Sequence, residues 1–108
     1  MSWKVSLQID TGNGEMVQVS DDHTFVGEVE KMYQKAGLNK TFNDINGNSA
    51  KIVAATLGPV ITYMVKNPKK MRKLNPSNTH NTYEGALEFL KEIAADCTRH
   101  PKCVVVVS

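Results

Sequence analysis

The first twenty residues alternate apolar and polar side chains, which is the pattern of half-buried β-strands. Residues 3–9 form the first predicted strand, and residues 16–20 form the second. The apolar positions of the two strands are Trp3, Val5, Leu7, Ile9, Val17 and Val19. Because these positions are two residues apart, the pattern predicts a β-hairpin with one apolar face.

The loop of this hairpin follows from its register. A two-residue turn at 13–14 would place Ile9 opposite Gln18, so that an apolar and a polar side chain share a face. A three-residue loop, residues 12–14, instead places Ile9 opposite Val17. We therefore predict the longer loop, with its last glycine in the left-handed conformation of a β-bulge.

The next segment predicts a short helix and a loop. Residues 21–24 offer several helix caps, and Gly37 would end the helix that follows. The apolar stripe of this helix is Phe25, Val29, Met32 and Tyr33. Residues 39–48 are polar apart from Phe42 and Ile45, so we expect a loop held by these two apolar side chains.

The middle of the chain predicts the most buried helix. It begins at a cap, Asn48 or Ser49, and ends near residues 67–68. Its wide apolar face is formed by Ile52, Val53, Leu57, Val60, Ile61, Met64 and Val65. Proline inside a helix removes a hydrogen bond, so we expect a break at Gly58 and Pro59.

The C-terminal third predicts helix followed by strand. Residues 68–74 form a basic turn, and a helix capped at Asn81 or Thr82 runs towards Pro101. Residues 103–107 are a β-branched run typical of a strand inside a sheet. The expected fold is an α+β domain of order β-β-α-α-α-β. Its three-stranded, mainly antiparallel sheet has the C-terminal strand beside the first strand, and the helices pack mainly on one face.

Length and composition indicate one globular domain, residues 1–108. Apolar residues make up 41% and charged residues 22% of the chain, which are ordinary values. No apolar run approaches the roughly 20 residues that span a bilayer. The N-terminus has no secretory signal pattern and no glycine at position 2. We therefore expect a soluble, cytoplasmic protein with no membrane partner.

Charge is unevenly distributed along the chain. Residues 46–80 contain six basic and no acidic residues, whereas residues 1–45 have a net charge of −3 and residues 81–108 a net charge of −1. The positive charge is concentrated in a basic segment formed by Lys66, Lys69, Lys70, Arg72 and Lys73. Such asymmetry can mark a partner surface, and a solvated turn is the plainer interpretation.

The last predicted helix carries a row of acidic side chains. The row is formed by Glu84, Glu88, Glu92 and Asp96, which recur every four residues and therefore share one face. A solvated face is the default interpretation. The alternative is a face that docks a basic partner or the chain's own basic segment.

The two cysteines and a nearby histidine could form a metal site. Cys97, His100 and Cys103 superficially offer three soft ligands, but structural zinc usually takes four ligands with tight paired spacing. A disulfide would close a very short loop and would be unusual in a reducing compartment. We prefer two reduced cysteines packed as small apolar side chains, and we expect no metal and no cofactor.

No catalytic set is suggested by residue spacing, so we do not expect an enzyme. Residues 12–14 join two strands instead of opening a helix, which argues against a nucleotide cradle. His80 lies just before a helix N-terminus, where backbone N–H groups favour anions. The loop 75–82 is therefore an alternative site for a small ligand or anion.

The C-terminal third resembles a group of small uncharacterised proteins of tailed phages and prophage-bearing bacteria. The matching residues are Leu74-Asn75-Pro76, Asn78, Tyr83-Glu84-Gly85-Ala86-Leu87, Phe89-Leu90, Ile93, Cys97, Pro101 and the Val-x-Val-x-Ser ending. The resemblance covers about the last 35 residues. It implies a phage origin, no known enzymatic activity and no catalytic residues.

The leading hypothesis is a small phage accessory protein that binds a host protein in a takeover or anti-defence role. Its contact surfaces would be the basic segment and the acidic side chains of Glu84, Glu88 and Glu92. Nucleic-acid binding through the basic segment is the first alternative, and a ligand at His80 is the second. Homodimerisation through an exposed sheet edge is a further expectation.

Overall fold

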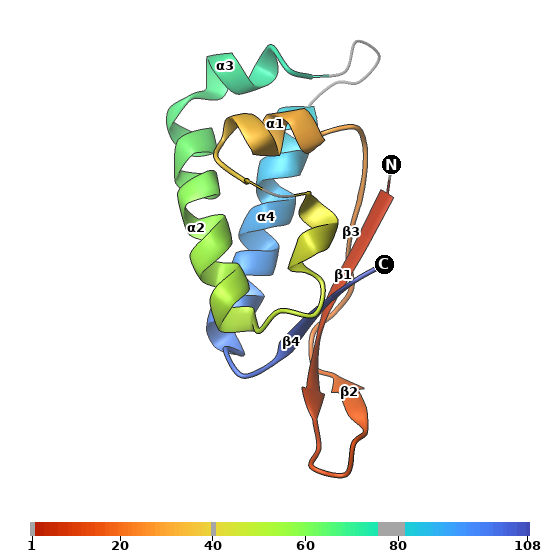
Figure 1. Cartoon of the computed structure of the whole chain (residues 1–108). Helices are drawn as coiled ribbons and strands as arrows, with labels where there is room; N and C mark the ends of the chain where they lie inside the picture. The colour runs from red at the N-terminus through yellow and green to blue at the C-terminus, as the bar shows by residue number, and fades with distance from the viewer. Residues whose placement is uncertain (1, 40, 76–81) are drawn as a thin grey trace.

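The computed structural model describes residues 2–39, 41–75 and 82–108. It is an α+β fold in which helices pack on one side of an antiparallel sheet (Figure 1). In chain order the elements are β1 (Ser2–Asp10), β2 (Met16–Gln18), β3 (His23–Val26), α1 (Glu30–Lys35), the short 3-10 helix η1 (Phe42–Ile45), α2 (Ala50–Lys66), α3 (Pro68–Arg72), α4 (Thr82–Arg99) and β4 (Val104–Val107).

β1 is the centre of the sheet and pairs with every other strand. Val5 is paired with His23 of β3 on one side and with Val107 of β4 on the other. Gln8 is likewise paired with Gln18 of β2 on one side and with Val104 of β4 on the other, so β2 and β3 share one edge of β1 and β4 lies along the other. The predicted position of the C-terminal strand beside the first strand is confirmed.

The predicted hairpin register is confirmed. Ile9 lies opposite Val17, and the Thr11 N–H donates to the Glu15 carbonyl at 3.0 Å, which leaves the three-residue loop 12–14. Gly14 has a φ of +81°, the left-handed conformation expected of it.

The third strand corrects the sequence prediction. The pattern predicts a helix cap and a first helical turn at residues 23–26, but these residues form β3 and the following helix is limited to Glu30–Lys35. The tertiary reason is an aromatic cluster on the inner face of the sheet. Phe25 lies opposite Trp3, and its ring centroid is 5.5 Å from that of Phe89 on α4. Packing against residues far along the chain outweighs the local capping signal.

A two-residue insertion separates β2 from β3. Val5 and Gln8 are three residues apart on β1, whereas their partners His23 and Gln18 are five residues apart. At this bulge the Leu7 N–H donates to the Ser20 hydroxyl at 2.9 Å, where a regular ladder would supply a carbonyl. The bulge turns the chain so that β3 packs against α4.

α2 is continuous, so the predicted break at Gly58 and Pro59 is wrong. Pro59 is exposed, and so is Ala55, whose carbonyl loses its helical donor and faces water instead. The predicted start is confirmed, because the Ser49 hydroxyl accepts the Ile52 N–H at 3.3 Å. The apolar face is narrower than predicted, since the Ile52 side chain is among those that remain exposed.

The remaining predicted apolar positions lie largely in the core. Phe42 and Ile45 are buried in η1, and Met71 of α3 is buried while Leu74 packs against the core. The two cysteines are free thiols and both are buried, as the preferred interpretation predicted. Among the described residues, no helix is both long and apolar enough to cross a membrane.

Candidate functional site

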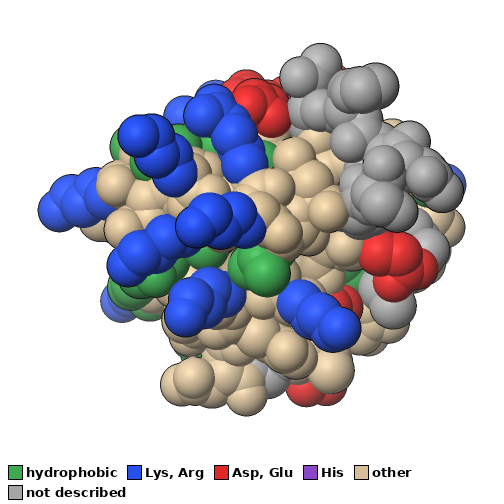
Figure 2. Space-filling view, turned by 90° about the horizontal axis from the view of Figure 1, so that it is seen from above, with side chains coloured by type: hydrophobic (Ala, Val, Ile, Leu, Met, Phe, Trp, Pro, Cys, Tyr) green, Lys and Arg blue, Asp and Glu red, His purple; other side chains and the backbone are tan. Residues whose placement is uncertain are grey.

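The basic segment lies at one end of the molecule. Lys66 closes α2, three members lie in α3, and Lys73 follows directly. All five side chains are exposed, and Figure 2 shows Lys and Arg side chains gathered over the end that carries α3. The exposed Lys31 and Lys35 belong to α1, which lies at the same end in Figure 1.

Two side chains fix α3 in place. Met71 is fully buried in the core. Arg72 lies over the Tyr83 ring at 5.3 Å from its centroid, and its guanidinium pairs with the Glu84 carboxylate at 3.0 Å. The Tyr83 hydroxyl in turn donates to the Met64 carbonyl at 2.5 Å, near the end of α2. The short helix is therefore held from one side and presents its lysines on the other.

The four lysines of the basic segment are not paired with acidic side chains within the described part of the chain. No carboxylate there lies within 4.0 Å of the amines of Lys66, Lys69, Lys70 or Lys73. Within the described residues, Arg72 is the one member of the basic segment that is paired, and its partner Glu84 belongs to the predicted acidic row. The structure thus brings the two predicted surfaces together at this contact.

The acidic row of α4 is not one solvated face. Glu84, Glu88 and Glu92 are exposed, as predicted. Asp96 is buried, with only 10% of its side chain exposed, which corrects its placement in the row. Asp96 also follows the buried Ile93 by three residues and directly precedes the buried Cys97, so it lies at the margin of the apolar stripe.

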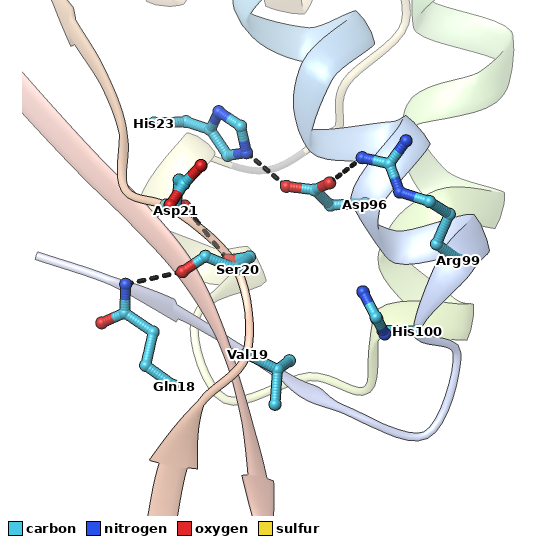
Figure 3. Close-up of a pocket in the computed structure, with 8 residues that line it drawn as sticks. All are labelled: Gln18, Val19, Ser20, Asp21, His23, Asp96, Arg99 and His100. Carbon is cyan, nitrogen blue, oxygen red and sulfur yellow. Dashed lines mark hydrogen bonds and ion pairs between the residues drawn. The ribbon is translucent and has the colours of Figure 1, made fainter.

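Asp96 forms the centre of a polar groove that sequence reasoning missed (Figure 3). The groove has a volume of about 490 Å³. Its lining residues are Gln18, Val19, Ser20 and Asp21 from the hairpin side, His23 from β3, and Asp96, Arg99 and His100 from the end of α4.

One carboxylate joins the two walls of the groove. Asp96 accepts hydrogen bonds from His23 Nε2 and from the Arg99 guanidinium, one through each oxygen. Burial raises the pKa of the Asp96 carboxyl, but these two donors outweigh it and hold the pKa below its usual value. The pair links β3 to α4 across 73 residues of sequence.

The polar side chains of the groove differ in how far they are already engaged. His23 Nδ1 faces the Glu92 carboxylate at 3.4 Å, so both nitrogens of this ring are directed at carboxylates. The Ser20 hydroxyl accepts from the Leu7 N–H and donates to the Asp21 carbonyl. The Arg99 side chain is 66% exposed and keeps further N–H donors for a bound group.

The other candidate residues are not assembled into a site. Within the described ranges, no three His, Cys, Asp or Glu side chains are placed to hold a metal ion, and Cys97, His100 and Cys103 form no such group. Burial, with a smaller contribution from Asp96, raises the pKa of the Cys97 thiol to about 11. His80 and the Asn81 cap lie outside the described residues.

Comparisons with known protein families, with curated proteins and with solved structures found no match.

Proposed function

We propose that the protein acts by binding an acidic protein partner with the basic segment, without catalysis. The observation that carries the proposal is that Lys66, Lys69, Lys70 and Lys73 have no acidic partner among the described residues. Unpaired charges of one sign on one surface raise the association rate with a partner of opposite charge and suppress wrong partners. With a phage origin, as the C-terminal resemblance implies, the partner is a host protein and the role is takeover or anti-defence.

The neighbouring surface of α2 favours a protein over a nucleic acid. Next to Lys66, the Val65 side chain is 51% exposed, and the outward face of α2 continues through the uncharged Thr62, Pro59 and Ala55. Protein interfaces combine an apolar centre with a polar rim. Single-stranded nucleic acids are bound through exposed aromatic rings, whereas Tyr83 is buried beneath Arg72.

The test is capture of partners from lysate by the tagged protein, with and without nuclease. The variant is Lys69→Glu/Lys73→Glu, and the matched control is Lys51→Glu/Lys91→Glu, which makes the same change in net charge at exposed lysines elsewhere. We expect a protein that is retained after nuclease, lost with the variant and kept with the control. Titration of that purified protein should then show affinity weakened about tenfold or more by the variant.

Two outcomes overturn the proposal. Retention that disappears after nuclease, with affinity for a labelled DNA duplex that falls steeply between low and moderate salt, assigns the basic segment to nucleic acid. Equal capture by the variant and the control shows that the basic segment is not the contact surface.

A further inference from the structure

The β1–β2 hairpin projects from the body of the molecule. Its tip extends beyond the end of the helices in Figure 1, and the molecule measures 48 × 24 × 20 Å. Residues 8–19 form this projection, which we call the arm. A strand rises about 3.4 Å per residue, so the loop at residue 12 lies roughly 15 Å beyond the start of the arm.

The inner face of the arm is apolar and uncovered. Leu7 is fully buried, and the same face of the sheet continues outwards through Ile9, Val17 and Val19. These three side chains are 37%, 45% and 38% exposed. Ile9 and Val17 lie directly opposite each other, so the exposed side chains form one patch instead of scattered positions.

The edges of the arm have no further strand paired with them within the described residues. β4 begins at Val104, opposite Gln8, so within the described residues the β4 side of Ile9 and Asp10 has no strand partner. On the other side, β2 is an edge strand whose three residues, Met16–Gln18, carry no charge. An edge strand presents unpaired backbone N–H and C=O groups to which another chain can add.

The groove and the arm have complementary chemistry within the same chain. The arm carries two carboxylates, Asp10 and Glu15, and no basic residue. Across the groove, the turn from α4 to β4 carries the basic side chains of Arg99, His100 and Lys102. Val19, at the base of the arm, belongs to both surfaces and gives the groove an apolar wall. The Asp96 carboxylate already accepts hydrogen bonds from two donors of its own chain.

We propose that two copies of the chain associate by exchanging arms. The arm of each copy enters the groove of the other, so that the inner apolar faces pack together and the acidic tip of each arm reaches the basic turn of its partner. Both halves of the contact lie on one chain, so a two-fold arrangement makes every contact twice and closes at a dimer. This proposal is independent of the basic segment, which lies at the opposite end of the molecule (Figure 1).

The first experiment measures the mass of the purified protein by light scattering and sedimentation over a range of about 5 µM to 500 µM. We expect a reversible dimer. Val17→Lys should weaken dimerisation at least tenfold, because two lysines would be placed in the apolar contact. Val26→Lys is the control, since Val26 is 79% exposed on β3 of the same sheet and lies outside the arm.

A charge swap tests the placement of the tip. Glu15→Lys and Lys102→Glu should each weaken the dimer, and the two changes combined should restore it. Circular dichroism of every variant separates lost association from lost folding. A protein that stays monomeric at the highest concentration, or equal effects of Val17→Lys and Val26→Lys, overturns the proposal. Failure of the combined swap to restore association overturns the groove as the receptor of the tip.

Discussion

Replacing Asp96 by asparagine should destabilise the fold by about 2 kcal/mol at neutral pH. Leaving a buried hydrogen-bonding group without its partner typically costs about 1–3 kcal/mol, and more where a charge is involved. The expected value lies within this range because asparagine still accepts a hydrogen bond and because the Arg99 side chain is largely in water. The His23 side chain is only 15% exposed, so most of the lost stability comes from the weakened hydrogen bond to this ring.

Urea unfolding monitored by tryptophan fluorescence gives a direct measurement. Trp3 is the single tryptophan of the chain and is 3% exposed, so its emission reports the loss of the core. For a slope of about 1–1.5 kcal/mol per molar urea, the midpoint should fall by roughly 1.3–2 M. Glu88→Gln is the matched control, because it removes an exposed carboxylate of α4 and should leave the midpoint nearly unchanged.

The effect of Asp96→Asn should depend on pH with a definite sign. The pKa of this carboxyl is lower in the folded chain than its unfolded value of about 3.9. Its contribution to stability is therefore complete above about pH 4 and is lost as the pH falls through the folded-state pKa. The difference between wild type and variant should shrink towards pH 3. A difference that is absent at pH 7, or equally large at pH 3, would refute the role assigned to the pair.

Three further predictions test other features. Gly14→Ala should lower the free energy of unfolding by about 1 kcal/mol, because alanine is strained at a φ of +81°. Asn13→Ala should have little effect, and the urea unfolding midpoints of the two variants test this difference. Pro59→Ala should raise the melting temperature, because it returns an N–H to a helix interior and the site is exposed; an unchanged or lower value contradicts this account. Cys97 and Cys103 should resist a thiol reagent at pH 7–8 until urea is added, because both are buried and the pKa of each thiol is raised; rapid labelling of the native protein would show that they are accessible.

The sequence predicts the hairpin well because its determinants are local. Alternation fixes which side chains share a face, and the two glycines of the loop permit the register that pairs Ile9 with Val17. The C-terminal strand is similarly clear, since a run of four valines fits few alternatives. The predicted break at Pro59 is wrong because this proline lies on the solvent side of the helix. The carbonyl that loses its helical hydrogen bond there can be reached by water, so the helix continues.

The groove could not be predicted because it depends on distant pairs. His23 looks like a cap when only its neighbours are considered, and Asp96 fits the four-residue spacing of an exposed acidic row. Their contact spans 73 residues and exists only because the bulge after β2 and the aromatic partner of Phe25 turn residues 23–26 into a strand. Position along a helix indicates which way a side chain points, but not what it meets.

The pairing of β1 with β4 has a consequence for synthesis. β1 is synthesised well before β4, the strand that completes its second edge and beside which Lys4 and Ser108 exchange backbone hydrogen bonds at 3.0 and 2.9 Å. Until β4 has left the ribosome, this edge of β1 and its buried Val5 and Leu7 lack their final cover. Helices and hairpin can form earlier, whereas the sheet closes last, because contacts of such long sequence separation carry the largest loop-closure cost. Nascent chains are therefore exposed to mispairing at this edge until β4 emerges.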